Sequence, residues 1–129
     1  MKAKRINDPA EFETTIAEIV AAAPGPVYVV LFGTELPETG ESFCPDCVVA
    51  DPTIRRALLA HENSANLTLV EVPIGDRTSW RSADNFYRAH EQIQLERIPT
   101  LVRWTADGAA ERLVEDDCAD ADKLAAFLG

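Results

Sequence analysis

The apolar residues of this chain form two kinds of pattern, short continuous runs and longer runs with helical spacing. The run at 27–32, Val-Tyr-Val-Val-Leu-Phe, is continuous and rich in β-branched residues, which predicts a central strand buried on both faces. Other apolar runs predict further strands at 2–6, 67–72, 100–105 and 110–114. An Asp-Gly pair between the last two runs is typical of a hairpin turn.

Helical spacing of apolar residues recurs between these strands. The first helix is expected to begin at Asp8 as N-cap, with Glu11 completing a capping box, and to end at the Ala-Pro-Gly segment 22–26. Further helices are expected at 45–61, 82–92 and 120–128. In the second of these, Phe86 and Ile93 are expected to face inward, and residues 75–79 before it are expected to form a loop.

The expected order of elements is β-α-β-α-β-α-β-β-α, which is typical of an α/β domain. The chain has 129 residues, so it is predicted to be a single domain over 1–129 that can bury a core without disulfides. We expect a central mixed sheet of four or five strands flanked by helices on both faces.

Charge narrows the classes of partner. Twelve Lys and Arg against 22 Asp and Glu give a net charge of −10, a field that repels nucleic-acid phosphates and anionic lipid head groups. We therefore expect no nucleic-acid partner and no membrane partner. With no apolar leader and no run of transmembrane length, a cytoplasmic location is expected. Three cysteines are an odd number for a secreted disulfide framework, and a reducing compartment favours their catalytic use.

The motif with the clearest chemistry is Cys44-Pro45-Asp46-Cys47. Pro45 has no amide donor and a preset φ, so it suits the first position of a helix that begins just after Cys44. The positive end of that helix favours a thiolate, which makes Cys44 the expected nucleophile. The charge of Asp46 opposes this effect, so the pKa of Cys44 is expected in the upper half of the range of about 3.5 to 7.5. Cys47 lies about a turn inside the helix and is expected to act second.

The same cysteine spacing is also half of a zinc site. Zinc would need two further ligands, and the remaining Cys118, His61 and His90 form no second pair. The alternative to a redox dithiol is therefore a non-catalytic module that holds zinc or an iron–sulfur cluster through Cys44 and Cys47, for example between two subunits. Cys118 is expected to be a small buried residue, and the two histidines are assigned no chemistry.

Together, the Cys-Pro-Asp-Cys motif and the strand start Ile98-Pro99-Thr100 make the chain resemble thioredoxin-fold proteins. In particular it is similar to the small cytosolic thioredoxin-related proteins of the thioredoxin domain-containing protein 17 group. The resemblance runs from the first helix to the C-terminus. It includes the polar loop before the motif, Pro52, Trp80 and the Val-Glu-Asp-Asp-Cys segment 114–118.

The resemblance implies a thioredoxin-like fold and a disulfide reductase that acts on small-molecule disulfides and selected protein disulfides. No cofactor would be bound, and the electrons would come from NADPH through a thioredoxin reductase. By this resemblance, Cys44 is the nucleophile and Cys47 the resolving thiol. Pro45 and Asp46 support them, and Pro99 is a cis-proline beside them.

One departure from the group affects the surface that would meet a client. Phe43 stands where the group has tryptophan. This change leaves the dithiol chemistry possible. It affects substrate choice, because the surface expected to contact the substrate consists of Phe43, Ile98 and Trp80. Trp80 has two interpretations, a packing residue or a platform for substrate.

Ten residues separate the first buried strand from the motif, and three of them are glutamates: Glu35, Glu38 and Glu41. They are interpreted either as a solvated loop or as an acidic rim that disfavours anionic clients such as oxidised glutathione. Strand 27–32 contains no aspartate that could accept a proton from Cys47. Asp46, or a loop glutamate acting through water, is therefore expected to take that role.

Overall fold

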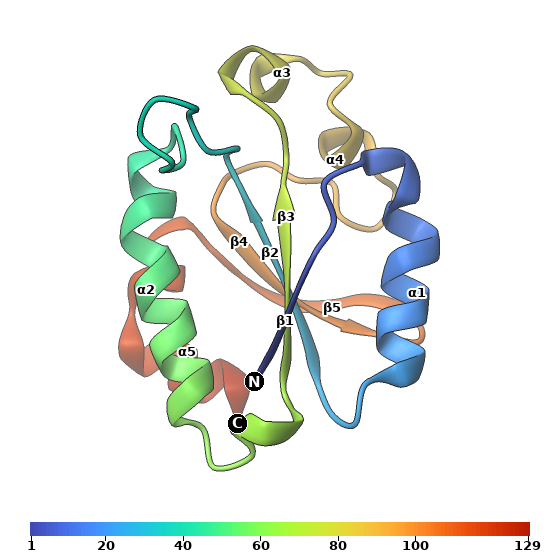
Figure 1. The fold of residues 1–129 in the computed structure, drawn as a ribbon, viewed down its shortest axis with the longest axis vertical. Helices are drawn as coiled ribbons and strands as arrows, with labels where there is room; N and C mark the ends of the chain where they lie inside the picture. The colour runs from blue at the N-terminus through green and yellow to red at the C-terminus, as the bar shows by residue number, and fades with distance from the viewer.

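Five strands form one mixed sheet in the computed structural model, which describes all of residues 1–129 (Figure 1). The strand order across the sheet is β1-β3-β2-β4-β5. The first three strands are parallel to one another, whereas β4 runs antiparallel to β2 and β5 antiparallel to β4. The strands are β1 Lys2–Arg5, β2 Val27–Phe32, β3 Thr68–Pro73, β4 Thr100–Thr105 and β5 Gly108–Val114.

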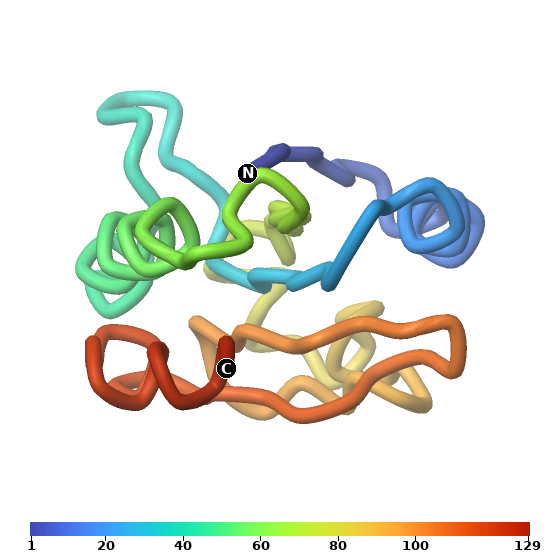
Figure 2. The backbone as a smooth tube through the Cα atoms, turned by 90° about the horizontal axis from the view of Figure 1, so that it is seen from below, coloured from blue at the N-terminus to red at the C-terminus, as the bar shows by residue number.

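Helices cover both faces of the sheet, as expected for a thioredoxin-like α/β fold (Figures 1 and 2). The helices α2 and α5 pack on one face, and α1 packs on the other together with the segment that contains α3 and α4. The helices are α1 Phe12–Ala22, α2 Pro45–Ala60, α3 Arg77–Arg81, α4 Phe86–Ala89 and α5 Ala121–Leu128. Short 3-10 turns lie at 9–11, 64–66 and 115–119.

Strand β2 is central and buried on both faces, which confirms the prediction from its continuous apolar run. Because side chains alternate along a strand, Val27, Val29 and Leu31 join the core beneath α1. Tyr28 and Val30 point the other way and join the core beneath α2. The strand leads directly into the loop that carries the cysteine motif, so the motif lies at the carboxyl end of the parallel strands.

The first helix begins differently from the prediction. The Asp8 side chain does accept a hydrogen bond from the amide of Ala10, at 2.9 Å, but it caps a 3-10 turn rather than the α-helix. The α-helix proper starts at Phe12, and Glu11 occupies its N-cap position without a side-chain hydrogen bond. The predicted capping box is therefore wrong, because a 3-10 turn precedes the α-helix and the Glu11 side chain makes no capping hydrogen bond.

The single helix predicted over 82–92 is also wrong, and so is the loop predicted just before it. Two short helices, α3 and α4, stand there instead. Asp76 caps α3 by accepting from the amide of Ser79 at 2.8 Å, and Asn85 caps α4 by accepting from the amide of Tyr87 at 3.0 Å. Polar caps, rather than apolar spacing, decide where these helices begin.

The start of α4 at Asn85 also changes which aromatic side chain is buried. Tyr87 is fully buried and meets Phe12 edge to face, with ring centroids 5.6 Å apart. Phe86, predicted to face inward, is 37% exposed, whereas Ile93 is buried as predicted.

The predicted hairpin between β4 and β5 is confirmed, although β5 begins at Gly108, two residues earlier than expected. Gly108 has φ of +106°, and a Cβ there would overlap the side chain of Gln92. Gln92 in turn accepts a hydrogen bond from the amide of Ala109 at 2.8 Å. Glycine at this turn is therefore favoured by the positive φ, and a larger residue would also have to displace the end of the Gln92 side chain.

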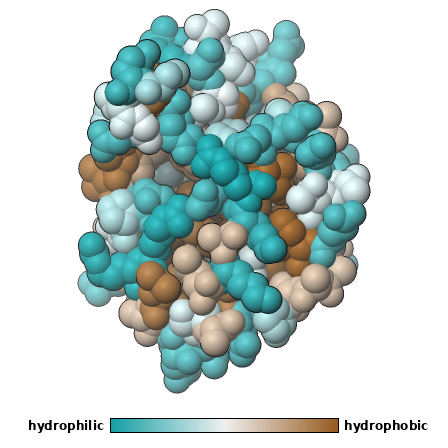
Figure 3. Space-filling model, in the orientation of Figure 1, coloured by the Kyte–Doolittle hydropathy of each residue, from teal (hydrophilic) through white to brown (hydrophobic).

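Hydrophilic residues dominate the face of the molecule seen in Figure 3, and hydrophobic residues show through only in small separate areas. No helix has both the length and the apolar character needed to cross a membrane.

Candidate active site

The loop from β2 to α2 is a small hairpin rather than an irregular segment. The amide of Leu36 donates to the carbonyl of Glu41 at 2.7 Å, which closes its tip. Its base is fastened to the end of β3, because Thr34 and Gly75 exchange hydrogen bonds at 3.0 and 3.1 Å. The loop therefore holds the start of α2 in a fixed place beside the sheet.

Cys44 is the N-cap of α2, and Pro45 is its first residue, as predicted. The amide of Cys47 donates to the sulfur of Cys44 at 3.3 Å, and the amide of Cys44 donates to the hydroxyl of Ser42 at 3.1 Å. Cys44 is half-buried, Cys47 is only 4% exposed, and both are free thiols. Ser42 was missed at the sequence level, although serine two residues before a helix start is a common local turn motif.

The two thiols have opposite tendencies to ionise. Hydrogen bonding from Cys47, through its thiol and its amide, lowers the pKa of Cys44 to about 7, against burial and the nearby charge of Asp46. The hydrogen bond with Cys44 and burial raise the pKa of Cys47 far above its ordinary value. The Ser42 hydroxyl acts in the opposite direction on that pKa without reversing it. One half-exposed thiol is therefore ready to ionise near neutral pH, and its buried neighbour is not.

We expect Asp46→Asn to lower the pKa of Cys44 below about 7, because the negative charge of Asp46 now raises it. The thiolate fraction below pH 7 should rise about twofold to fourfold. Ultraviolet absorbance of the thiolate, followed against pH, gives the midpoint. An unchanged or raised midpoint would mean that the Asp46 charge does not act on Cys44.

A segment 54 residues further along the chain lies against the nucleophile. The peptide bond between Ile98 and Pro99 is cis, and the carbonyl oxygen of Ile98 is 3.8 Å from the sulfur of Cys44. The amide of Ile98 donates no hydrogen bond within the chain. The structure therefore places Pro99 beside the cysteines and leaves a backbone amide unused next to Cys44.

The three residues expected to form a substrate surface line one groove beside Cys44. This groove has a volume of about 320 Å³ and is lined by Phe43, Trp80 and Ile98 together with several charged side chains. The ring of Phe43 packs over Gly33, where a Cβ would lie within 2.6 Å of it. Trp80 is partly buried beneath the guanidinium of Arg88, which lies 3.5 Å from the ring centroid. Trp80 thus both packs and lines the groove.

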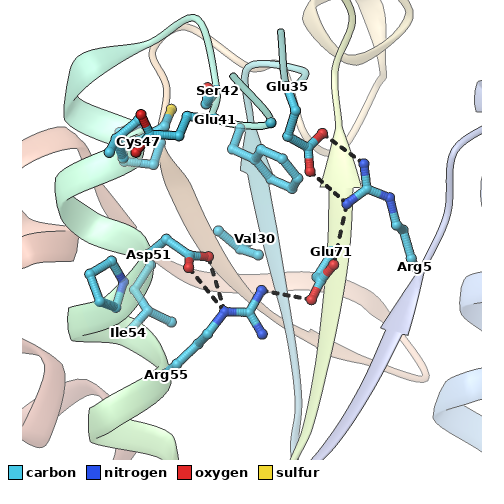
Figure 4. A pocket seen from close by; sticks show the side chains of 15 residues that line it. Arg5, Val30, Glu35, Glu41, Ser42, Cys47, Asp51, Ile54, Arg55 and Glu71 are labelled. Atoms are coloured by element: carbon cyan, nitrogen blue, oxygen red, sulfur yellow. Dashed lines mark hydrogen bonds and ion pairs between the residues drawn. The ribbon is translucent and has the colours of Figure 1, made fainter. Parts of the chain in front are cut away.

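A second hollow, the Cys47 cleft, lies on the other side of the motif, between α2 and the sheet (Figure 4). It measures about 510 Å³, and a chain of ion pairs crosses it. The successive pairs are Glu35–Arg5 at 2.8 Å, Arg5–Glu71 at 3.4 Å, Glu71–Arg55 at 2.6 Å and Arg55–Asp51 at 3.1 Å. Arg5 lowers the pKa of Glu35 through this contact.

The three loop glutamates therefore have different surroundings, although the sequence pattern alone gives no reason to distinguish them. Glu35 is bound by Arg5 in the Cys47 cleft, and Glu41 lines the same cleft without an ion pair. Glu38 lies exposed at the tip of the loop. None of the three lines the groove beside Cys44.

The third cysteine is remote from solvent. Cys118 is fully buried, as predicted, and burial raises the pKa of its thiol to about 12. It donates to the carbonyls of Leu113 and Pro99, at 3.3 and 3.7 Å. His61 and His90 are the residues at which α2 and α4 end. No cluster of three or more His, Cys, Asp or Glu side chains in the chain could hold a metal ion.

Comparison with known proteins agrees with this geometry. The family model described as "Thioredoxin domain-containing protein 17-like, thioredoxin domain" matches residues 6–129. The chain belongs to the thioredoxin domain-containing protein 17-like family. It is 33% identical to the thioredoxin-like protein Clot of Oryza sativa subsp. japonica, over 92% of this chain and 90% of that protein. It is 35% identical to thioredoxin domain-containing protein 17 of Danio rerio, over 70% of this chain and 68% of that one.

Solved structures confirm the thioredoxin-like fold of this family member. Thioredoxin O2 of Arabidopsis thaliana superimposes with a TM-score of 0.64 at 15% identity, over 98% of this chain and 91% of that one. Spinach chloroplast thioredoxin f superimposes with a TM-score of 0.62 at 20% identity, over 98% of this chain and 84% of that one. Family membership together with the Cys44/Cys47 pair supports a thioredoxin-type redox role.

Proposed function

We propose that this thioredoxin domain-containing protein 17-like chain is a disulfide reductase that acts on protein and small-molecule disulfides by dithiol–disulfide exchange. The observation that carries the proposal is the asymmetry of the pair. Cys44 is half-buried with a pKa lowered to about 7, whereas Cys47 is buried with a raised pKa and donates its amide to the Cys44 sulfur. An attacking thiol works best when its pKa is close to the ambient pH.

The reaction has two exchange steps. The Cys44 thiolate attacks one sulfur of the client disulfide, so the client S–S bond breaks, a mixed disulfide forms and one client thiolate leaves. Cys47 then loses its proton and attacks the Cys44 sulfur, which releases the second client thiolate and leaves a Cys44–Cys47 disulfide. Two electrons pass from the protein dithiol to the client. The unused amide and the carbonyl of Ile98 offer a client strand backbone partners beside the reacting sulfurs.

The proton of Cys47 needs an acceptor, and the Cys47 cleft offers one. Glu35, Glu71 and Asp51 are each paired with an arginine, whereas Glu41 lines the cleft without an ion pair. We assign Glu41 as the acceptor, acting through water in the cleft. Asp46, the other acceptor considered from the sequence, does not line the cleft.

Glu41→Gln is expected to slow resolution of the mixed disulfide about tenfold while leaving its formation unchanged, because only the second step needs this base. Quenched-flow mass spectrometry during a single turnover measures both steps. Glu38→Gln removes the same charge from the same loop outside the cleft and should have no effect. Equal rates in wild type and Glu41→Gln would remove Glu41 from the reaction.

We further propose that the dithiol is regenerated by a thioredoxin reductase with electrons from NADPH, that the protein binds no cofactor, and that it works in the cytoplasm without nucleic-acid or membrane partners. The test is NADPH oxidation in the presence of the protein, a thioredoxin reductase and a disulfide peptide. We expect turnover that depends on all three components.

The alternative, a module that holds zinc or an iron–sulfur cluster through the same cysteines, makes a different prediction. Protein purified under reducing conditions would then carry stoichiometric metal and would fail to support NADPH oxidation. Metal analysis of the same preparation therefore separates the two functions.

A further inference from the structure

The charge of the groove beside Cys44 is opposite in sign to the charge of the whole protein. The chain carries −10, yet arginines outnumber glutamates three to two among the charged side chains that line the groove. Arg97 is already paired with Glu115, with 2.7 Å between the guanidinium and the carboxylate. Arg77 and Arg88 form no ion pair, and Glu96 is the only unpaired acid in the lining.

Arg77 is held next to the nucleophile. The Asp76 cap starts α3 at Arg77, and the guanidinium then lies 5.3 Å from the ring centroid of Phe43. One of its nitrogens is 3.4 Å from the carbonyl oxygen of Phe43, the residue directly before Cys44. Because a guanidinium has five N–H donors and Arg77 uses one nitrogen for the Phe43 carbonyl, its other donors make no hydrogen bond within the chain.

Arg88 adds a second fixed positive charge. It stacks on Trp80 and donates to the carbonyl of that residue at 2.6 Å. The loop glutamates do not offset these arginines at short range, because none of them lines the groove. A client bound in the groove therefore contacts two guanidinium groups without ion pairs, whereas the loop glutamates lie outside the lining.

We propose that the groove selects client disulfides flanked by carboxylate side chains, with Arg77 as the residue that determines this specificity. The inference rests on the proposed reductase function. A carboxylate next to the client cysteine can bind the Arg77 guanidinium while the cysteine sulfur lies at Cys44. The preference is the reverse of the one expected from the acidic loop in the sequence.

The test uses three synthetic peptides, each closed by one disulfide and alike except for the residues that flank the cysteines, which are Glu, Gln or Lys. The value of kcat/KM is measured for each with NADPH and thioredoxin reductase. Wild type should favour the Glu peptide over the Lys peptide about twofold to fivefold, the size of one exposed ion pair.

Two arginine variants separate a local contact from net charge. Arg77→Gln should abolish the Glu-over-Lys preference. Arg81→Gln makes the same charge change on the same helix, and since Arg81 does not line the groove it should keep the preference. Replacing Glu35 and Glu38 together with Gln removes acidic charge from the loop without touching Glu41, and it should leave the ranking of the three peptides unchanged.

Three results would overturn the inference: a wild-type preference for the Lys peptide, an equal loss in the Arg77 and Arg81 variants, or a reversed ranking in the double glutamate variant. Absence of turnover with every peptide is a different outcome, since it contradicts the reductase function itself.

Discussion

Cys47→Ser is expected to accumulate a stable mixed disulfide with a client peptide, because Cys44 can still attack and nothing resolves the bond that it forms. Cys44→Ser is expected to form no adduct and to lose at least about a thousandfold in turnover, since Cys47 is 4% exposed and its pKa is raised. Intact-protein mass spectrometry after mixing each variant with the Gln peptide distinguishes these outcomes.

The third cysteine provides the matched control for this prediction. Cys118 should form no adduct in the Cys44→Ser variant, and the single variant Cys118→Ser should keep near-normal turnover, because the Cys118 thiol is fully buried. Its cost is expected in stability, at about 1 to 3 kcal/mol in the free energy of unfolding. An adduct on Cys44→Ser but not on Cys47→Ser would reverse the order of attack.

The rate of attack by Cys44 should rise about tenfold between pH 6 and pH 8 and then level off. The pKa of Cys44 is about 7, so the reactive thiolate is a minor form at pH 6 and the major form at pH 8. Alkylation by iodoacetamide, followed by peptide mapping of Cys44, measures this profile directly. A midpoint near the free-cysteine value of about 8.5 would contradict the depressed pKa.

The same measurement tests the cause of the depressed pKa. Hydrogen bonding from Cys47 is the largest contribution that lowers it. Cys47→Ala removes the thiol donor, so its alkylation midpoint should move above about 7, toward the free-cysteine value. A midpoint that stays in place would assign the effect to the helix start alone.

The parts of the fold that depend on apolar pattern could be predicted from the sequence. Val27–Phe32 is continuous and apolar, and it is the central strand. Pro45 after Cys44 marks the start of α2 because proline is suited to only a few helix positions. The part of the site formed by Cys44 and Cys47 could therefore be predicted from the local sequence.

The segment between β3 and β4 could not be predicted in the same way. Its helices have five and four residues, too few to show helical spacing, and their starts are fixed by the side chains of Asp76 and Asn85. Asn85 also donates to the carbonyl of Ile74 at 2.8 Å, a contact that depends on the tertiary fold. Because the Asn85 cap fixes where α4 begins, Tyr87 rather than the neighbouring Phe86 lies in the core.

The electrostatics of the site depend on residues far apart in the chain. Glu35 is neutralised by Arg5, thirty positions earlier, and Arg77 reaches Phe43 from thirty-four positions later. A sequence places three glutamates before the cysteines and no arginine beside them. Only the fold shows that the acidic loop faces the Cys47 cleft while arginines line the groove of Cys44.

The most direct test of the central claim is a single turnover without any reductase. Fully reduced protein is mixed with an equal amount of the Gln disulfide peptide, quenched with acid, alkylated and analysed by mass spectrometry. One reduced peptide is expected for each protein molecule that acquires a Cys44–Cys47 disulfide, with Cys118 still a thiol. Protein that keeps both thiols free beside an intact peptide disulfide would contradict the proposed reductase function.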